Sequence, residues 1–377
     1  MFELERRAVF TKKWLLVSHT KRLQDAGEYV HLTVAGYSFF LIRSRQGEIF
    51  AHHNVCRHRA SPLVLKDSGK LQVLSCRYHG WTYGFDGHLA KAPNYQDYPS
   101  FDKTSNGLFS IHVHVDRMGY IWVNFDSREK PKVAWDEDFA SFDVQPRLSY
   151  FNMDDYTFDH QWHIVGDFNW KVFADNYNEC YHCSTAHSAL SAIDFAGYYV
   201  NLSGYSIQHF PIEEERINES AETQVCTTFC YPFSATTVSA NMMYVIRCTP
   251  VSERQVKIEY EVYRHKNASD EQFHGINNFV KAILEEDKDL CNGVQKNLEA
   301  EIFTTGELHH RVEKGPRYFQ QLTRKLIMEH RRREEAAQTI ISSAAPEQTL
   351  SETTKEDVDF CSKLDCDPSS TAKELSW

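Results

Sequence analysis

The chain has 377 residues, more than the roughly 100–200 of a typical single domain, so its length predicts two domains. It carries 41 Lys and Arg against 52 Asp and Glu, a net charge of −11 with histidine counted as neutral. We expect no nucleic-acid partner, because phosphate contacts need a surplus of cationic side chains. Nor is a membrane partner expected, since no segment approaches the ~18 consecutive apolar residues of a membrane span. The charged start, residues 3–7, leads into no apolar secretory region, so we expect a cytoplasmic protein without visible organellar targeting.

The first part of the chain has the pattern of short strands. Apolar and polar residues alternate from residue 29 to residue 50, with glycines as turn signals. A stronger pair of strands is predicted at 109–115 and 120–125, joined by a short turn. We therefore expect an all-β domain over residues 14–130. It is preceded by an N-terminal helix over residues 1–13, which is expected to pack on the second, catalytic domain.

Two cysteine–histidine pairs lie among these predicted strands. The first is Cys56-Arg57-His58, and the second, seventeen residues later, is Cys76-Arg77-Tyr78-His79. Two thiolates and two imidazoles suit a two-iron, two-sulfide Rieske centre, in which one iron takes both cysteines and the other both histidines. Such a centre carries single electrons. A structural zinc site is the alternative, although zinc pairs are usually separated by roughly two to four residues and the first pair here by one.

A second concentration of metal-ligand types lies in residues 175–187. Glu179 and His182 are three residues apart and are expected to share one face of a helix. His187 follows Ser-Thr, which can end or bend that helix so that the two imidazoles converge. Two histidines with one carboxylate form a facial triad that leaves positions open on ferrous iron for oxygen and substrate. The segment therefore predicts a catalytic metal site.

Cysteines occur elsewhere in the chain without an obvious role. In a long chain without a leader, thiolate ligands and buried thiols are a better account of ten cysteines than disulfides are. Cys180 and Cys183 have the spacing of a zinc or redox pair, but no second pair follows at metal-site spacing. We therefore expect them to be small packing residues.

The carboxylate ligand is expected on a helix predicted over residues 271–298. Asp287 interrupts the apolar stripe of this helix, whose other predicted members are Ile283, Leu290, Val294 and Leu298. An unpaired buried carboxylate is costly unless a cation compensates it, so Asp287 is the predicted third ligand. The neighbouring acidic residues are expected to point elsewhere: Glu285, Glu286 and Asp289. The alternative is that the stripe ends at Leu284 and that Asp287 is solvated.

The remainder of the chain mixes helix and strand patterns. Strands are predicted at 242–247 and 255–264, and a last amphipathic helix begins at Gly315-Pro316. The expected fold class is therefore α+β, with the all-β Rieske domain followed by an α+β catalytic domain over residues 131–340. Residues 341–377 are rich in Ser, Thr, Glu, Asp and Lys, which predicts a flexible polar tail.

With both metal sites in view, the chain resembles the α subunit of the Rieske non-haem iron oxygenases over about residues 1 to 330. The resemblance rests on the two Cys/His pairs and on Asn169-Trp170-Lys171 followed by Glu179-x-x-His182-x4-His187. It implies a [2Fe-2S] cluster on Cys56, His58, Cys76 and His79. It also implies mononuclear Fe(II) on His182, His187 and Asp287, in a catalytic domain of helix-grip type with an antiparallel sheet.

The same resemblance assigns Glu179 a role in electron transfer. Family members place a carboxylate there that links an iron-ligand histidine to a cluster histidine across a subunit boundary, here His182 to His79. An acceptor on the outer nitrogen of His182 would also fix its tautomer, whereas the alternative is an ordinary surface glutamate. Electrons that cross between subunits imply a ring-shaped homo-oligomer, and we expect a homotrimer.

Glutamate rather than aspartate at this position resembles the branch of the family that acts on quaternary ammonium compounds. The implied reaction is a monooxygenation that uses O2 to hydroxylate a small substrate, with choline to betaine aldehyde as the leading candidate. The chain shows no dinucleotide fingerprint, so electrons from NAD(P)H are expected through a separate reductase or ferredoxin.

The sequence says less about the substrate pocket. Aromatic rings bind trimethylammonium groups by cation–π attraction, and the candidates are Tyr177, Phe173, Tyr205 and Tyr244, although the same residues would also suit a core. Alternative functions are hydroxylation or demethylation of an aromatic or other metabolite, a Rieske electron carrier without oxygenase activity, and a zinc-bound interaction module. A carrier needs only the β domain, so the second domain counts against it.

Overall fold

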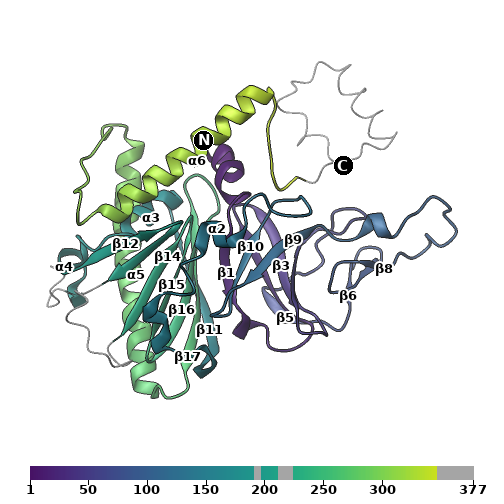
Figure 1. Ribbon diagram of the computed structural model, residues 1–377, viewed down its shortest axis with the longest axis horizontal. Coiled ribbons are helices and arrows are strands. Elements are labelled where there is room, and N and C mark those ends of the chain that lie inside the picture. Colours follow the sequence, from purple (N-terminus) through teal and green to yellow (C-terminus); the bar gives the residue numbers. More distant parts are fainter. Residues whose placement is uncertain (191–196, 211–223, 346–377) are drawn as a thin grey trace.

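Two β-sheet units lie side by side in the computed structural model, which describes residues 1–190, 197–210 and 224–345 (Figure 1). The first unit is built almost entirely from strands, and the second is an antiparallel sheet covered by helices. The expected fold class, an all-β domain followed by an α+β domain, is confirmed. Among the described helices, none has the length and apolarity needed to cross a bilayer. Most of the predicted tail, from residue 346, lies outside the described residues.

The N-terminal unit is a seven-stranded antiparallel sheet whose hairpins follow from its alternating pattern. In β2, Val30, Leu32 and Val34 are buried while His31 and Thr33 are not. A two-residue turn, Ala35-Gly36 with φ of 48° and 82°, joins β2 to β3, as the twist of a tight hairpin requires. In spatial order the strands are β1 (Leu15–His19), β10 (Tyr120–Asn124), β9 (Ser110–Val115), β4 (Ile49–His53), β3 (Tyr37–Arg43), β2 (Glu28–Val34) and β5 (Ser68–Lys70).

A smaller sheet stands at the far end of this unit and carries the cysteine–histidine loops (Figure 1). It consists of β6 (Leu74–Ser75), β7 (Thr82–Tyr83) and β8 (Leu89–Lys91). The buried Cys56 and Cys76 pack in one hydrophobic cluster with Trp81, which directly precedes β7, and with Phe40 and Ile42 of β3. The loops are therefore supported by one face of the main sheet.

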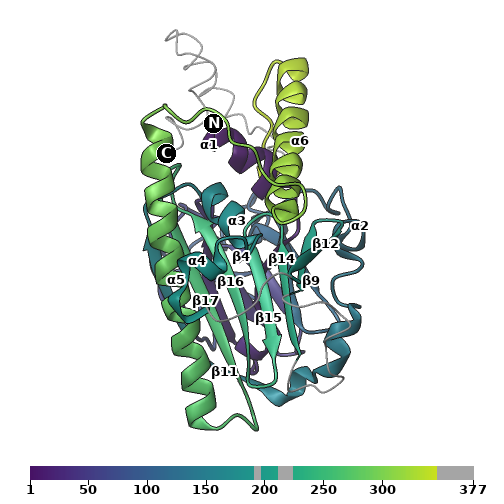
Figure 2. The same cartoon turned by 90° about the vertical axis from the view of Figure 1, so that its left-hand side faces the viewer.

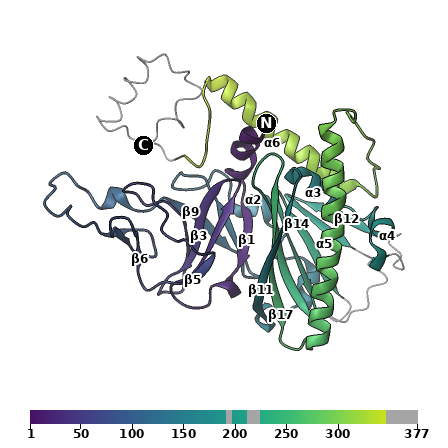
Figure 3. The same ribbon diagram turned by 180° about the vertical axis from the view of Figure 1, so that it is seen from behind.

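The second unit is one antiparallel sheet with a long helix on one face. The helix, α5 (Asp270–Glu299), runs along the sheet in Figures 2 and 3. It begins with a capping box in which Ser269 Oγ accepts from the Gln272 amide and Gln272 Oε1 accepts from the Ser269 amide. In spatial order the strands are β11 (Tyr156–Gly166), β17 (Val256–His265), β16 (Met242–Pro250), β15 (Ser234–Ser239), β14 (Val225–Cys230), β13 (Ser206–Phe210) and β12 (Tyr199–Ser203).

The buried stripe of α5 differs from the predicted one. Its buried residues are Phe273, Asn277, Leu284 and Cys291, whereas Leu290, Val294 and Leu298 are exposed in this chain. Asp287 lies three residues after Leu284 and four before Cys291, which places it on the buried face. The predicted stripe was wrong in its members, but Asp287 does interrupt the face that packs on the rest of the domain.

Further helical segments lie at the start of the chain, between the units and at the end of the second unit. The chain begins with α1 (Phe2–Glu5) and a π-helical turn (Arg6–Phe10), and α2 (Trp135–Phe139) follows the first unit. The buried carboxylate of Glu5 accepts from Trp170 Nε1 (3.0 Å) and pairs with Lys171 Nζ (2.5 Å). The helix α6 (Lys314–Ala337) packs against the π-helical turn and pairs Glu334 with Arg7 (2.8 Å). The start of the chain is thus held against the second unit.

A buried polar group joins the two sheets directly. Arg247 Nη1 on β16 lies 3.1 Å from Glu261 Oε1 on β17, and both residues are almost fully buried. The same guanidinium donates to the Val17 carbonyl on β1, and Ser18 Oγ donates to Glu261 Oε2 (2.8 Å). Removing one partner of a buried ion pair costs about 3–5 kcal/mol, because the other charge is left uncompensated. The arrangement therefore fixes one sheet against the other.

The contact between α6 and the loop before Glu179 gives a test of the packing. A Cβ on Gly315 would lie 2.1 Å from the Asn178 carbonyl oxygen, so Gly315→Ala should push the helix from the loop and cost about 1–3 kcal/mol. The control is Gly293→Ala on α5, where no atom lies within 4 Å and alanine should stabilise the helix by about 0.5–1 kcal/mol. Thermal unfolding measures both, and an unchanged midpoint for Gly315→Ala would contradict the packing described.

Candidate metal centres

The helix that leads into the second metal-ligand segment is short and well defined. The helix α3 (Trp170–Tyr177) is capped by Asn169, whose Oδ1 accepts from the Lys171 amide. It ends at Tyr177, five residues before His182, and α4 (Cys183–Ala186) starts only after His182. Glu179 and His182 are therefore not on one helix, and that expectation was wrong.

The side chain of Glu179 explains why the helix stops. Its Oε2 accepts from the backbone amides of Tyr181 and His182, so the side chain takes the place of a backbone carbonyl. Its Oε1 contacts His182 Nδ1. Only 12% of the Glu179 side chain is exposed, which rules out the alternative of an ordinary surface glutamate. The predicted contact is present, but a turn rather than a helix produces it.

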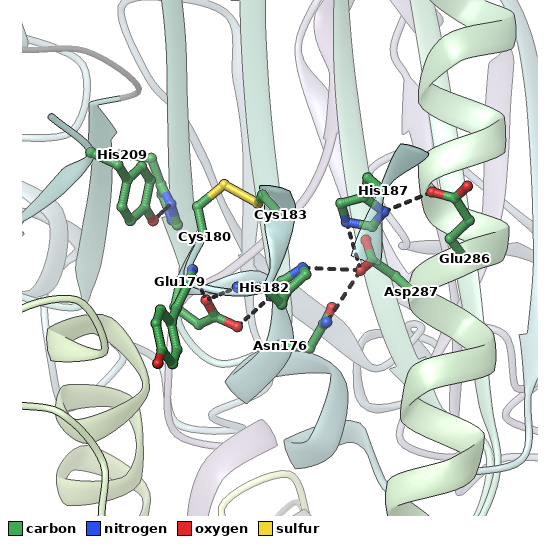
Figure 4. Close-up of a disulfide and its surroundings, with 11 residues drawn as sticks. Asn176, Glu179, Cys180, His182, Cys183, His187, His209, Glu286 and Asp287 are labelled. Carbon is green, nitrogen blue, oxygen red and sulfur yellow. Dashed lines mark hydrogen bonds and ion pairs between the residues drawn. A yellow bond between two sulfur atoms is a disulfide. The ribbon is translucent and has the colours of Figure 1, made fainter. Parts of the chain in front are cut away.

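Three predicted ligands meet at one point (Figure 4). His182 Nε2 and His187 Nε2 each lie 3.3 Å from Asp287 Oδ1, and Asn176 Nδ2 donates to the same oxygen (3.2 Å). The histidines come from either end of α4, and the carboxylate comes from the buried face of α5. Asp287 is thus paired and largely buried, so the alternative of a solvated carboxylate does not hold.

Each imidazole is also held from its outer side by a carboxylate. Glu179 contacts Nδ1 of His182, and Glu286 Oε2 lies 2.8 Å from Nδ1 of His187. Glu286 was expected to point elsewhere, and this was wrong: the His187 ring lies against α5, so adjacent helix residues reach its two nitrogens. The missed signal was the need of a metal-binding histidine for an acceptor on its second nitrogen.

The electrostatics show what the converging groups require. Burial opposes charge on His182, but hydrogen bonds to Asp287 and Glu179 raise its pKa to about 9. The hydrogen bond to Asp287 likewise raises the pKa of His187. Burial acts to raise the pKa of Asp287, but the two imidazoles lower it overall. Protons thus supply the positive charge between the carboxylate and the rings.

A divalent cation could replace those protons. Nitrogens and oxygen 3.3 Å apart are close to the separation of neighbouring ligand atoms on a metal with bonds of about 2.1 Å. The residues therefore fit a metal held by two neutral histidines and one carboxylate.

The loops of the first unit bring the other predicted ligands together. Cys56 and Cys76 are buried free thiols in mutual contact, and the rings of His58 and His79 are 4.4 Å apart between centroids. His58 stacks on Trp81 at 5.0 Å, and its buried Nδ1 has no hydrogen-bond partner. Two thiols and two imidazoles, one with an unsatisfied nitrogen, fit an iron–sulfur cluster.

The two loops also share a backbone geometry. The amide of Ala60 donates to the Cys56 carbonyl and that of Gly80 to the Cys76 carbonyl, both at 3.0 Å. Ala60 and Gly80 have φ of 53° and 72°, so each loop closes in the left-handed region four residues after its cysteine. The histidine of the second loop, His79, is exposed at the surface.

The predicted pocket residues separate into two groups. Tyr177 packs on Phe173 (5.7 Å between centroids), and the hydroxyls of Tyr177, Thr237 and Tyr244 hydrogen-bond to one another. Tyr205 lies elsewhere, because Lys13 Nζ sits 3.6 Å from its ring centroid and its amide bonds to the Asp138 carbonyl. It belongs to the junction between the units rather than to this aromatic group.

Sequence reasoning missed two aromatic residues that extend this group. Tyr260 lies 5.3 Å from Tyr244 and stacks on Trp162 at 4.4 Å. Trp162 and Tyr260 are paired across β11 and β17, and Lys281 of α5 lies 5.3 Å from the indole. They therefore lie on the face of the sheet that α5 covers. Their proximity follows from the pairing of β11 with β17, which the local sequence does not show.

The cysteines that flank His182 are not separate thiols. Cys180 and Cys183 form a disulfide, with Cα atoms 5.0 Å apart across the turn between α3 and α4. The expectation that they are small packing residues was wrong. Their three-residue separation suits a disulfide here because the chain turns rather than continuing as a helix.

Comparison with known proteins finds two family models, one that matches the first unit and one that matches the second. The Rieske [2Fe-2S] domain matches residues 13–102, and the catalytic domain of the ring-hydroxylating α subunit matches residues 153–224 and 208–329. The chain is 29% identical over 333 residues to chloroplastic choline monooxygenase of Atriplex hortensis. The aligned region covers 84% of this chain and 73% of that protein. It is 29% identical over 314 residues to the carnitine monooxygenase oxygenase subunit of Escherichia coli K12, with 79% and 81% covered.

Solved structures agree with these relatives. The quaternary ammonium Rieske monooxygenase CntA in complex with L-carnitine is similar with a TM-score of 0.74 and 27% identity, covering 86% of this chain and 92% of that one. Naphthalene 1,2-dioxygenase is similar with a TM-score of 0.69 at 18% identity, which shows a shared fold.

The carboxylate on His187 gives a prediction about metal affinity. Glu286→Gln should weaken divalent metal binding by about 10–100-fold, because the amide is a poorer acceptor for Nδ1 and makes the imidazole a weaker ligand. Glu285→Gln is the control, since Glu285 pairs with Lys288 on the exposed side of the same helix. Competition with a chromogenic chelator measures the affinity, and equal affinities in the two variants would exclude a role for Glu286.

Proposed function

This chain belongs to the Rieske non-haem iron oxygenases, and within that family we propose that it hydroxylates a small quaternary ammonium compound, with choline as the first candidate. The observation that supports this is the convergence of two Nε2 atoms on Asp287 while a carboxylate holds each Nδ1. Two histidines and one carboxylate would hold a metal ion as a facial triad and would leave positions open for O2 and substrate.

We propose His182, His187 and Asp287 as the ligands of mononuclear Fe(II). Cys56, His58, Cys76 and His79 are the proposed ligands of the [2Fe-2S] cluster. The chemistry that such a pair of centres supplies when bound is the reductive activation of O2 beside a substrate. The chain's own contribution is to fix both imidazoles in the tautomer that presents Nε2. The groups that do so are Glu179 and Glu286.

The positions of the two sites support electron transfer between subunits. In Figure 1 the loops near β6 and β8 and the helix α4 lie at opposite ends of the molecule. His79 and the neighbouring Tyr78 are exposed at one end, and Tyr181, beside Glu179, is 68% exposed at the other. A second copy of the chain could therefore bring its His79 to the Glu179–His182 pair. We propose a closed ring of such contacts, a homotrimer.

The aromatic group beneath α5 supports a cationic substrate. The rings of Tyr244, Tyr260 and Trp162 contact one another on the face of the sheet that packs against α5, the helix that carries Asp287. Cation–π attraction contributes about 0.5–2 kcal/mol per ring for a desolvated trimethylammonium group. The named relatives act on choline and carnitine, which share that group.

A carboxylate-bearing substrate such as carnitine is the second candidate. It is favoured by Lys281, whose ammonium group lies over the Trp162 ring at the same aromatic group. A cation there could pair with a substrate carboxylate, which choline lacks. Electrons for either substrate are proposed to come from NAD(P)H through a separate reductase or ferredoxin.

The proposed activity makes a joint prediction about metal and substrate. The purified protein should be brown, hold about three irons per chain, and consume O2 with choline or carnitine when a surrogate reductase supplies electrons. His182→Ala should keep the colour but lose one iron and the substrate-dependent O2 uptake. Two irons per chain in the wild type without O2 uptake would instead indicate an electron carrier, and bound zinc an interaction module.

The proposed electron path gives a separate prediction. Glu179→Gln keeps an oxygen for the amides of Tyr181 and His182 but removes the negative charge, so the turn should form and the [2Fe-2S] site should load normally. Because the amide also makes His182 a weaker ligand, turnover is compared with the mononuclear site filled in excess iron. Turnover should fall by about 10–100-fold, since the amide weakens the link through His182. Iron analysis, the visible spectrum and O2 uptake are the measurements. Wild-type turnover in this variant would show that electrons take another route.

A further inference from the structure

The disulfide next to the iron site carries an inference that rests on the proposed function. We infer that reduction of Cys180–Cys183 turns Cys183 into a thiolate ligand, which joins His182 and His187 in binding a thiophilic divalent cation such as Zn²⁺. The disulfide would then be the device that keeps sulfur out of the oxygenase metal centre.

The geometry places Cys183 beside the ligands already described. Its Sγ and one ring nitrogen from each of His182 and His187 all lie within 4.8 Å of one another. Cys183 is buried, with 7% of its surface exposed, so a thiolate there would lack the solvation that stabilises charge. A metal ion would supply the missing positive charge. Cys180 is not part of this group of ligand atoms, which makes the two cysteines inequivalent.

Metal preference explains why the oxidation state would matter. Two histidines and a carboxylate suit ferrous iron and leave positions for O2 and substrate. Two histidines and a thiolate suit zinc, and the sulfur would occupy one of those positions. In the disulfide the sulfur is not a thiolate, so this second ligand set does not exist. The same loop would thus offer either a carboxylate-bound iron site or a thiolate-bound zinc site.

The redox step is an ordinary thiol–disulfide exchange. A dithiol reductant attacks the S–S bond, two thiols form on the chain, and the reductant leaves as its own disulfide. Two electrons and two protons pass from the reductant to the cysteines. When the metal binds, the Cys183 thiol releases its proton to solvent.

The loop is expected to keep its course after reduction. Glu179 Oε2 still accepts from the amides of Tyr181 and His182, which lie inside the turn that the disulfide closes. The Ala186 amide still donates to the His182 carbonyl (2.8 Å). Because these bonds do not involve sulfur, replacing one cysteine should leave both histidines in place.

Two variants of the full-length protein separate the cysteines. Cys180→Ser leaves Cys183 permanently free, and Cys183→Ser leaves only Cys180. After chelator treatment of the mononuclear site, Co²⁺ is added as a coloured probe for Zn²⁺, and spectra are taken against the same variant loaded with Zn²⁺. Subtraction cancels the iron–sulfur absorption, and the cluster loops are identical in both variants. Alkylation before and after reduction, followed by mass measurement, counts the thiols.

A thiolate-to-cobalt absorption band in the near ultraviolet should appear for Cys180→Ser and be absent for Cys183→Ser. The wild type should show it only after treatment with dithiothreitol, together with two additional alkylated cysteines. A band of equal intensity in both variants, or no band in reduced wild type and Cys180→Ser, would overturn the inference.

The oxygenase assay keeps this result separate from the proposed function. Iron-loaded, oxidised wild type that consumes O2 with substrate, while Cys180→Ser gives no band, removes the inference and leaves the oxygenase standing. If Cys180→Ser shows the band but the iron-loaded, oxidised wild type consumes no O2 with substrate, the proposed oxygenase function falls and the thiolate site remains.

Discussion

Asp287 is the group on which the arrangement of the second unit depends. One carboxylate oxygen faces two imidazole nitrogens in a largely buried setting, so three polar side chains that have lost most of their hydration must share a compensating charge. Protons can supply it, as the raised pKa of His182 indicates, and a metal cation can do so with greater charge. The capped helix α5 and the turn made by Glu179 bring these groups together from opposite sides. The geometry of the sheet behind them is what keeps helix and turn at the required separation.

Much of this centre could be predicted from the sequence, because Cys, His and carboxylate residues at these spacings are typical of metal ligands. The Cys/His pairs and the Glu179, His182 and His187 spacing identified the residues that the structure brings together. Asp287 followed from the cost of burying a carboxylate, although the predicted stripe included the exposed Leu290 and Val294. The prediction of Asp287 did not depend on identifying the other buried residues correctly. Any orientation of α5 that buries Leu284 and Cys291 also places Asp287, between them, on the buried face.

The failures have a common physical origin in contacts between distant segments. Nothing in the local sequence shows that His187 lies against α5, so the role of Glu286 could not be found. Likewise, Trp162 and Tyr260 are nearly one hundred residues apart and meet only through strand pairing. Tyr205 was wrongly predicted to line the substrate pocket, because an aromatic residue type alone does not distinguish a pocket from the contact between the two units. Helix propensity also failed at Glu179, where one side chain bonded the backbone and ended the helix.

The buried Arg247–Glu261 pair and its bonds to Val17 and Ser18 also constrain any assembly of the chain. Because exposing these buried charges would be costly, the group holds the two sheets of each polypeptide in a fixed arrangement, with one proposed metal centre near either end. In the proposed ring, the distance between the cluster of one subunit and the iron site of the next would then depend on how neighbouring subunits pack. Small changes in the fit between neighbouring copies would alter the rate of electron delivery while leaving the interior of every copy as it was.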